Sequence, residues 1–183
     1  MKVLIACEES QIECLAFRSR GHLAFSCDLQ KCSGGHPEWH IKCDVLEVLY
    51  DSWDLVIAHP PCTYLSNAGV WLMKTPERFL ECEKAAQFFM DLYNAPCPRV
   101  CVENPVPHKY ASLPPYSQII QPWQFGSIYN KRTCLWLRGL PDLVPGPFYT
   151  GPKRSFVYSR RSSFARSKSF PEIAFAMAAQ WSF

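Results

Sequence analysis

Short apolar runs recur along this chain, and polar or acidic residues follow most of them. The runs are Lys2–Cys7, His22–Asp28, Asp54–Ala58, Arg99–Val102 and Thr133–Leu137. Runs of this length and composition predict buried β-strands. Segments with helical patterns lie between them, so that strands recur at roughly 30-residue intervals, which is typical of βαβ units and a mostly parallel sheet. The pattern therefore predicts an α/β domain.

Four segments have the pattern of helices. Pro76–Asn94 is the clearest, because Thr75 can cap it, proline occupies its first position and acidic residues crowd its first turn. Glu8–Arg20, a short stretch after Asp44 and the closing segment Pro171–Trp181 are the other predicted helices. We expect these helices to cover both faces of the sheet.

The composition is that of one globular domain, residues 1–183. Of its residues, 48% are hydrophobic and 19% are charged. No apolar run approaches the roughly 20 residues that cross a membrane, and the first residues lack an export signal, so we expect a cytoplasmic location. Several of the ten cysteines lie inside apolar runs, where they pack as small hydrophobic residues. We expect free thiols.

The net charge of +3 is unevenly distributed along the chain. Residues 143–170 contain no Asp or Glu, but they hold basic residues interleaved with Phe and Tyr. The basic residues are Lys153, Arg154, Arg160, Arg161, Arg166 and Lys168. Positive charges among aromatic rings suit a polyanion whose bases can stack, and a solvated loop is the alternative. We call residues 143–170 the basic aromatic segment.

Polar side chains gather where the predicted strands end. Glu8, Asp28, Asp44, Cys62 and Glu103 each follow or lie close behind a strand. In parallel sheets, ligands bind outside the carboxyl ends of the strands, so this clustering predicts a site. A thiol there can act as a nucleophile once its surroundings activate it, and a carboxylate beside it can protonate or orient a substrate.

The pair Cys62 and Glu103 therefore suits covalent attack on an electrophilic ring carbon. Each residue also has a structural interpretation. Cys62 can be a buried cysteine after a Pro-Pro turn, and Glu103 can pair with an exposed lysine.

Two segments resemble catalytic motifs of the cytosine-C5 DNA methyltransferases. WDLVIAHPPCTYLS resembles the strand and Pro-Cys loop of that family, and VCVENPV resembles its Glu-Asn-Val segment. Residues 3–30, KCDVLEVL, QFGSIYNKRTCLWL and the closing helix match further segments in the same order. The resemblance spans nearly the whole chain and is greatest to small phage and prophage members that lack a full target-recognition domain. It implies a Rossmann-like methyltransferase fold.

The resemblance also implies a role for each matching residue. Cys62 would attack C6 of cytosine, and Glu103 would hydrogen-bond the ring edge at N3 and N4. Asn104 would brace the Pro-Cys loop. Lys131 or Arg132 would hold the base carbonyl or its phosphate.

S-Adenosylmethionine would be the methyl donor, with Asp28 on its ribose and Asp44 on its adenine. The full implied cofactor set is Ala6, Cys7, Glu8, Asp28, Leu29, Asp44, Val45 and Pro60. The implied partner is DNA, gripped by Lys153, Arg154, Arg160 and Arg161, with the target base flipped out of the duplex. No metal is implied.

This chain departs from the family pattern in two places. The glycine-rich first loop is replaced by Ala6–Ser10, and glycines there let the backbone approach the cofactor closely. Between Leu137 and Pro171 only about 33 residues remain, too few for a recognition domain with its own core. We therefore expect weak sequence specificity, a partner protein, or a nucleotide or single-stranded substrate.

Other readings of the same residues stay open. Cys32, His36, His40 and Cys43 are zinc-ligand types, although packing of this loop over the adenine, with Trp39 as a wall, is the favoured interpretation. His59-Pro60-Pro61-Cys62 also distantly resembles the Asp-Pro-Pro-Tyr loop of amino-methyltransferases. Two further functions are a nucleotide- or base-modifying enzyme that uses another donor, and a non-catalytic nucleic-acid-binding module.

Overall fold

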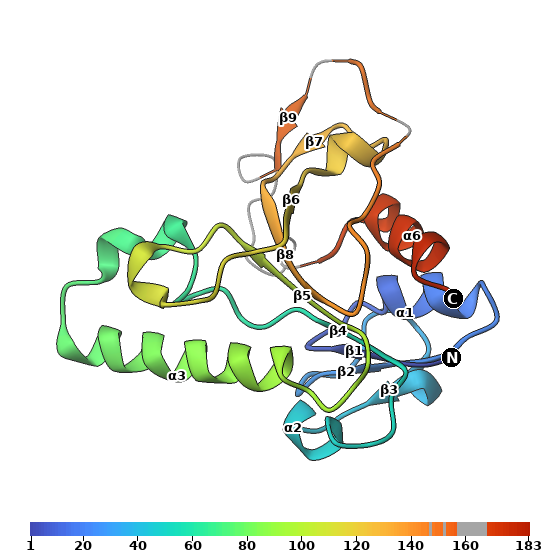
Figure 1. The fold of residues 1–183 in the computed structure, drawn as a ribbon, viewed down its shortest axis with the longest axis horizontal. Coiled ribbons are helices and arrows are strands. Elements are labelled where there is room, and N and C mark those ends of the chain that lie inside the picture. Colours follow the sequence, from blue (N-terminus) through green and yellow to red (C-terminus); the bar gives the residue numbers. More distant parts are fainter. Residues whose placement is uncertain (147, 152, 157–167) are drawn as a thin grey trace.

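A seven-stranded sheet forms the centre of the molecule in a computed structural model, which describes residues 1–146, 148–151, 153–156 and 168–183 (Figure 1). The strand order is β3-β2-β1-β4-β5-β8-β6. β8 runs antiparallel to both of its neighbours, whereas β3, β2, β1, β4 and β5 are parallel. The α/β fold with a mostly parallel sheet, predicted from the sequence, is therefore confirmed.

The strands of this sheet are β1 (Lys2–Ala6), β2 (Leu23–Cys27), β3 (His40–Ile41), β4 (Leu55–Ala58), β5 (Val100–Pro105), β6 (Gln118–Ile120) and β8 (Thr133–Arg138). A separate parallel pair is formed by β7 (Tyr129–Asn130) and β9 (Arg154–Ser155). The α-helices are α1 (Ile12–Arg18), α2 (Val45–Val48), α3 (Pro76–Tyr93) and α6 (Pro171–Gln180). Short 3-10 helices are η1 (Pro37–Trp39), η2 (Asn67–Leu72), η3 (Lys109–Ala111) and η4 (Pro122–Phe125).

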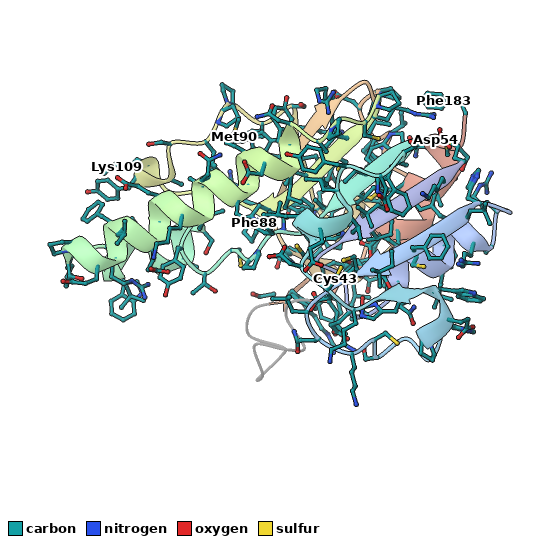
Figure 2. All side chains as sticks on the ribbon, turned by 90° about the horizontal axis from the view of Figure 1, so that it is seen from below. Cys43, Asp54, Phe88, Met90, Lys109 and Phe183 are labelled. Atoms are coloured by element: carbon teal, nitrogen blue, oxygen red, sulfur yellow. The ribbon has the colours of Figure 1, made fainter. Side chains whose placement is uncertain are left out.

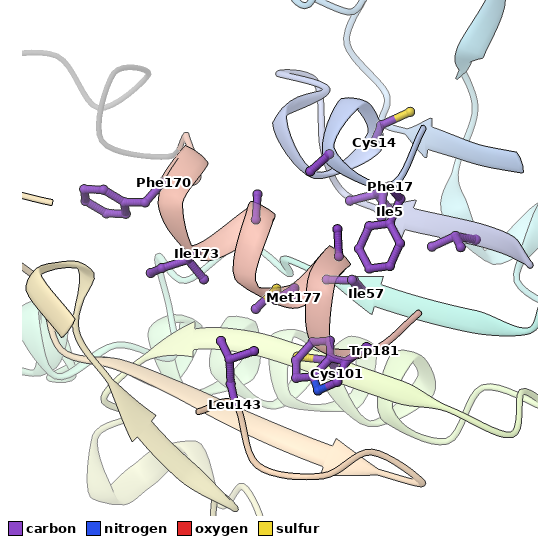
Figure 3. Close-up of a cluster of buried hydrophobic side chains, with 14 of the residues drawn as sticks. Ile5, Cys14, Phe17, Ile57, Cys101, Leu143, Phe170, Ile173, Met177 and Trp181 are labelled. Atoms are coloured by element: carbon purple, nitrogen blue, oxygen red, sulfur yellow. The ribbon is translucent and has the colours of Figure 1, made fainter. Parts of the chain in front are cut away.

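Both faces of the sheet are covered, which explains why its central strands are apolar throughout. Val3 and Ile5 of β1 pack in one hydrophobic cluster with α1 and α6, and Trp181 lies in the same cluster (Figure 3). Leu4 and Ala6 of the same strand pack in a second cluster, with residues of α2 and α3. Successive side chains of a strand point to opposite faces, so a strand buried on both faces shows no polar alternation.

Several boundaries differ from the prediction. The predicted helix Glu8–Arg20 begins only at Ile12, because Glu8 turns inward and accepts a hydrogen bond from the backbone N–H of Glu13 at 2.9 Å. β5 extends to Pro105, so Glu103 lies within a strand rather than after it, held by pairing with Leu135 of β8. β3 and β6 were not predicted, because strands of two and three residues are too short to show a pattern of apolar and polar residues.

Other predictions hold. Thr75 caps α3 by accepting a hydrogen bond from the N–H of Arg78 at 3.4 Å. All ten cysteines are free. Figure 2 shows Phe88 and Met90 on the long helix α3 and Cys43 close to β3, and all three pack against the second hydrophobic cluster. Within the part of the chain that the structure describes, no helix has the length and apolar character needed to cross a membrane.

Candidate active site

A buried histidine occupies the carboxyl edge of the sheet, directly after β4. The backbone N–H of His59 donates to the carbonyl of Ala6 at 2.9 Å, which ties the end of β4 to β1. Its Nδ1 lies 3.1 Å from Oε2 of Glu103 on β5, and its Nε2 lies 3.4 Å from Oε1 of Glu13 on α1. The imidazole thus stands between two carboxylates that come from different elements.

The electrostatics of this trio favour charged groups. Burial by itself lowers the pKa of His59, but the carboxylates of Glu13 and Glu103 outweigh it, so the pKa of His59 lies above its usual 6.5. Burial works in the opposite direction on Glu103. The hydrogen bond from His59, together with Lys131 and Thr133, nevertheless holds the pKa of Glu103 below its usual value. These opposite shifts of the two pKa values favour a charge-assisted hydrogen bond between a protonated His59 and an ionised Glu103.

The Pro-Cys loop is fixed next to this pair. The amide nitrogen Nδ2 of Asn104 donates to the carbonyl of Pro60 at 2.9 Å, the kind of contact that the resemblance implied for it. Beyond it, the backbone N–H groups of Leu65 and Ser66 donate to the carbonyl of Cys62 at 3.1 and 2.9 Å. The position of the half-buried Cys62 is therefore set by backbone hydrogen bonds and not by its own side chain.

The thiol of Cys62 is not activated at rest. Burial raises its pKa above the usual 9.0, and the charge of Glu103 raises it further, whereas Lys131 lowers it. At neutral pH the thiol form dominates, since a raised pKa disfavours the thiolate. A cation moving closer, or a substrate that neutralises Glu103, would shift this balance toward the nucleophile.

A narrow pocket opens onto the trio. Its lining residues are Glu13, His59, Glu103, Lys131, Thr133, Lys168, Ser169, Phe170, Ile173 and Met177. The volume open to the centre of a water molecule is about 20 Å³, which corresponds to about one ordered water. One wall of the pocket comes from residues at and before the start of α6, namely Lys168, Ser169, Phe170, Ile173 and Met177.

The two basic residues expected at this site are placed differently. Lys131 lines the pocket, with its ammonium 5.7 Å from the ring centroid of Phe156 and 5.8 Å from that of Phe170. Arg132 is exposed and does not line the pocket. Of the two, Lys131 is the one that the structure brings to Cys62 and Glu103.

The first loop adopts left-handed backbone conformations without glycine. Cys7 has φ 60° and Gln11 has φ 61°, and each such residue costs about 1–2 kcal/mol. Gln11 is fully buried, donating from Nε2 to the carbonyl of His36 and accepting from the N–H of His36. A Cβ added to Gly34 would lie 2.5 Å from Cβ of Gln11, so the loop after β2 packs directly on the first loop. This packing holds the strained turn in place.

The acids expected to hold a cofactor lie at the same edge. Burial raises the pKa of Cys7, and the charges of Asp28 and Asp44 raise it further, so both carboxylates face the end of β1. Asp28 also accepts from the N–H of Gln30, and Asp44 caps α2 by accepting from the N–H of Leu46. Both remain accessible to a ligand.

The remaining members of the implied cofactor set differ in exposure. Leu29 is 70% exposed and offers an apolar surface beside Asp28, whereas Ala6, Val45 and Pro60 are buried. Glu8 is buried as well, with its carboxylate turned toward α1. The edge thus presents two carboxylates and one apolar side chain, a set that fits a ribose and an adenine.

The effect of burial on the carboxyl group of Glu8 can be tested through the pH dependence of stability. Burial raises the pKa of Glu8 well above its usual 4.5, and neighbouring Glu13 raises it further. A raised folded-state pKa contributes stability that is present below pH 4.5 and is lost as the pH rises through the folded value. Glu8→Gln mimics the protonated acid. Its free energy of unfolding should therefore gain on the wild type by up to about 1.4 kcal/mol per pH unit.

Urea denaturation at pH 5, 7 and 9 would measure this gain. Glu47→Gln, an exposed glutamate of α2, serves as the control and should show no comparable trend. An equal difference between Glu8→Gln and the wild type at all three pH values would contradict a raised pKa of Glu8.

The zinc alternative finds no support in the positions of its four residues. The ring of His36 stacks on Trp39 with centroids 4.0 Å apart, and His40 bonds Ser26 and the carbonyl of Gln30. Sγ of Cys43 lies 3.9 Å from Sγ of Cys27 instead. Among the residues that the structure describes, no group of three or more His, Cys, Asp or Glu side chains could hold a metal ion.

The expected nucleic-acid residues are described only in part. Lys153 and Arg154 are exposed, with the ammonium of Lys153 4.5 Å from the ring centroid of Trp123. Arg154 belongs to β9 and pairs with Tyr129 of β7. Arg160 and Arg161 lie outside the described residues.

The polar residues around the His59–Glu103 pair were not predicted to be functional: these are Glu13, His59 itself and Thr133. Glu13 carries the clearest sequence signal, because it lies on the buried side of α1 among Cys14, Ala16 and Phe17. A lone acid among apolar residues on one helix face needs a partner, and in this fold its partner is His59.

No protein-family model matches this sequence, and no curated protein is detectably similar to it. Solved structures are similar. One is a protein assigned as a DNA modification methyltransferase encoded within a prophage of E. coli, with 12% identity and a TM-score of 0.53. The match covers 80% of this chain but only 51% of that structure, so this chain spans about half its length.

Another similar structure is the bifunctional kinase-methyltransferase WbdD. It has 15% identity and a TM-score of 0.41, and the match covers 78% of this chain and 35% of WbdD. At these identities, the prophage protein establishes a shared fold and no particular chemistry.

Proposed function

We propose that this chain is an S-adenosylmethionine-dependent methyltransferase that acts on C5 of cytosine in DNA, with Cys62 as its nucleophile. The observation that supports the proposal is that Glu103 and Lys131 line one pocket at the carboxyl edge of a methyltransferase-like sheet, with Cys62 on the adjoining loop and under the influence of both charges. These are the groups that covalent addition to a pyrimidine needs.

In the proposed reaction, the thiolate of Cys62 adds to C6 of the ring. The electron pair of the C5–C6 double bond moves to the C4–C5 bond, and the C4–N3 pair moves to N3, where Glu103 contacts the ring edge. Lys131 favours the thiolate, because its charge lowers the pKa of Cys62. Bound S-adenosylmethionine would be the source of the methyl group that C5 takes up. Loss of the C5 proton then expels the thiolate and restores the aromatic ring.

Asp28 and Asp44 would hold the ribose and adenine of the cofactor, with Leu29 against the adenine ring. Lys153 and Arg154 would contact phosphates, which positions a strand without reading its sequence. Choice of a target sequence would come from a partner protein.

Titration of S-adenosylmethionine by calorimetry tests the cofactor. Asp28→Ala should weaken binding by about 10- to 100-fold, because a hydrogen bond to a charged group contributes about 1.5–3 kcal/mol. Asp142→Ala is the matched control: Asp142 is exposed and follows β8, which ends at the opposite edge of the sheet. Asp142→Ala should bind like the wild type.

Other outcomes of this titration redirect the assignment. Absence of binding at millimolar ligand would remove the methyl donor and favour a base-modifying enzyme with another donor. Binding should be followed by mass spectrometry of nucleosides from treated DNA and of treated deoxycytidine monophosphate. Product on the free nucleotide alone would replace DNA as the substrate, and N4-methylcytosine in place of 5-methylcytosine would contradict attack by Cys62.

A further inference from the structure

The proposed reaction leaves one feature of the pocket unused. His59 is buried between Glu103 and Glu13, with its side chain only 13% exposed. Oε2 of Glu13 forms no hydrogen bond, and Oε1 of Glu8 accepts from the N–H of Glu13, so a second acid lies directly behind the first. A line of titratable groups therefore runs from α1 to the ring-binding carboxylate of Glu103.

The imidazole of His59 determines where a proton is held along this line of groups. A neutral imidazole can donate from only one of its nitrogens, and the other would turn a lone pair toward a carboxylate. Nδ1 lies 3.1 Å from the carboxylate of Glu103, and Nε2, which forms no hydrogen bond, lies 3.4 Å from that of Glu13, so a doubly protonated ring places its positive charge between the two acids. His59 thus stores a proton within hydrogen-bond reach of Glu103.

The charged groups around His59 come from each element that packs on it. Glu13 and Glu8 come from α1 and the loop before it, Glu103 from β5, and Lys131 from the chain before β8. Lys168 lines the same pocket from the chain before α6, and Cys62 lies on the loop that follows His59. Lys131 is close enough to oppose the proton on His59, but the two flanking acids dominate.

We propose that His59 is a positioning residue that supplies, through Glu103, the proton that N3 of cytosine takes up when Cys62 adds to C6. This proposal rests on the proposed function. The sulfur–C6 bond forms, and the electron pair displaced onto N3 accepts a proton from the Glu103 carboxyl group. Glu103 receives that proton from Nδ1 of His59. Elimination of the thiolate returns the proton along the same path, while Glu13 holds the ring at Nε2.

The relay predicts a pH profile with a plateau. Addition needs the thiolate of Cys62 together with protonated His59. Below the pKa of His59, the rate rises tenfold per pH unit with the thiolate fraction. Above it, loss of the His59 proton cancels that gain, so the rate levels off until the pH passes the pKa of Cys62, and then falls. The bend lies above pH 6.5 and the fall above pH 9.0.

Release of tritium from C5-tritiated cytosine in a single-stranded oligonucleotide measures addition without any cofactor, because addition lets C5 exchange with water. His59→Gln should slow release by about 100-fold at pH 7, as expected for loss of an acid catalyst. Its rate should also rise without a bend up to the pKa of Cys62. His22→Gln changes a histidine outside the pocket, whose ring contacts Met1 and Ser182, and it should keep both the wild-type rate and the bend.

Glu13→Gln is a second variant, which leaves both His59 and Glu103 in place. Removing one carboxylate should move the bend to lower pH, and a bend that stays in place would overturn the relay. A His59→Gln protein with the wild-type rate and profile would overturn the relay as well, while the proposed function stands. If the folded wild type and Cys62→Ser release tritium equally slowly, both proposals fail.

Discussion

Cys62→Ser should lower the rate of C5 methylation by about 10⁴-fold or more, because a serine hydroxyl ionises far less readily than a thiol and the covalent route is lost. The fold should survive, since the loop is held through the Cys62 carbonyl and the Asn104–Pro60 hydrogen bond rather than through the thiol. Transfer of a labelled methyl group to DNA, with circular dichroism of the variant, measures both.

Cys32→Ser is the matched control, because Cys32 is also free and half-buried. It should keep full activity. Methylation by Cys62→Ser at a rate within tenfold of the wild type would show that the cysteine is structural, and it would make transfer to the exocyclic nitrogen the better account of the Pro-Pro-Cys loop.

Trp181→Ala should lower the free energy of unfolding by about 3–5 kcal/mol, the range for removal of a buried aromatic side chain. Trp181 is completely buried just after α6, against the face of the sheet that carries Cys101, and its Nε1 donates to the carbonyl of Pro141 at 3.1 Å (Figure 3). The loss is a large part of a typical domain's 5–15 kcal/mol.

Urea denaturation would measure this loss against Phe175→Ala. Phe175 lies on the same helix and is 58% exposed, so its removal should change the free energy of unfolding by no more than about 0.5 kcal/mol. A loss below 1 kcal/mol for Trp181→Ala would mean that α6 is not held to the sheet by this side chain.

The longer strands could be predicted because a strand buried on both faces is apolar at every position, and this pattern is visible in the sequence of each strand alone. Leu55–Ala58 is apolar at every position, since residues of odd and even number each meet a helix layer. The long helix α3 likewise carries its own cap at Thr75. By contrast, β3 consists of two residues and exists only because β2 offers a free edge.

Only the site residues that belong to recognisable motifs could be predicted from the sequence. Cys62, Glu103 and Asn104 stand in recognisable segments, and the structure brings them to one edge. His59 depends on Glu13, which lies 46 positions earlier in the sequence, so their pairing follows from how α1 packs rather than from any spacing. The inward turn of Glu8 depends in the same way on a left-handed residue, Gln11, which no helical pattern anticipates.

Because β8 runs antiparallel to β5, its first residue lies beside the pocket and its last residue lies at the opposite edge of the sheet. Its first residue, Thr133, pairs with Pro105, so Lys131 reaches the pocket before the strand begins. Its far end leads to Gly139 at the opposite edge of the sheet. A Cβ atom added to Gly139 would lie only 2.1 Å from the carbonyl oxygen of Pro98, so the chain passes very close to Pro98 there. The chain that follows is tied back to the domain, because Leu143 and Phe156 are buried in the core and β9 pairs with β7 next to Lys131. A protein engineer who lengthens this connection must therefore leave Leu143, Phe156 and the β7–β9 pair in place.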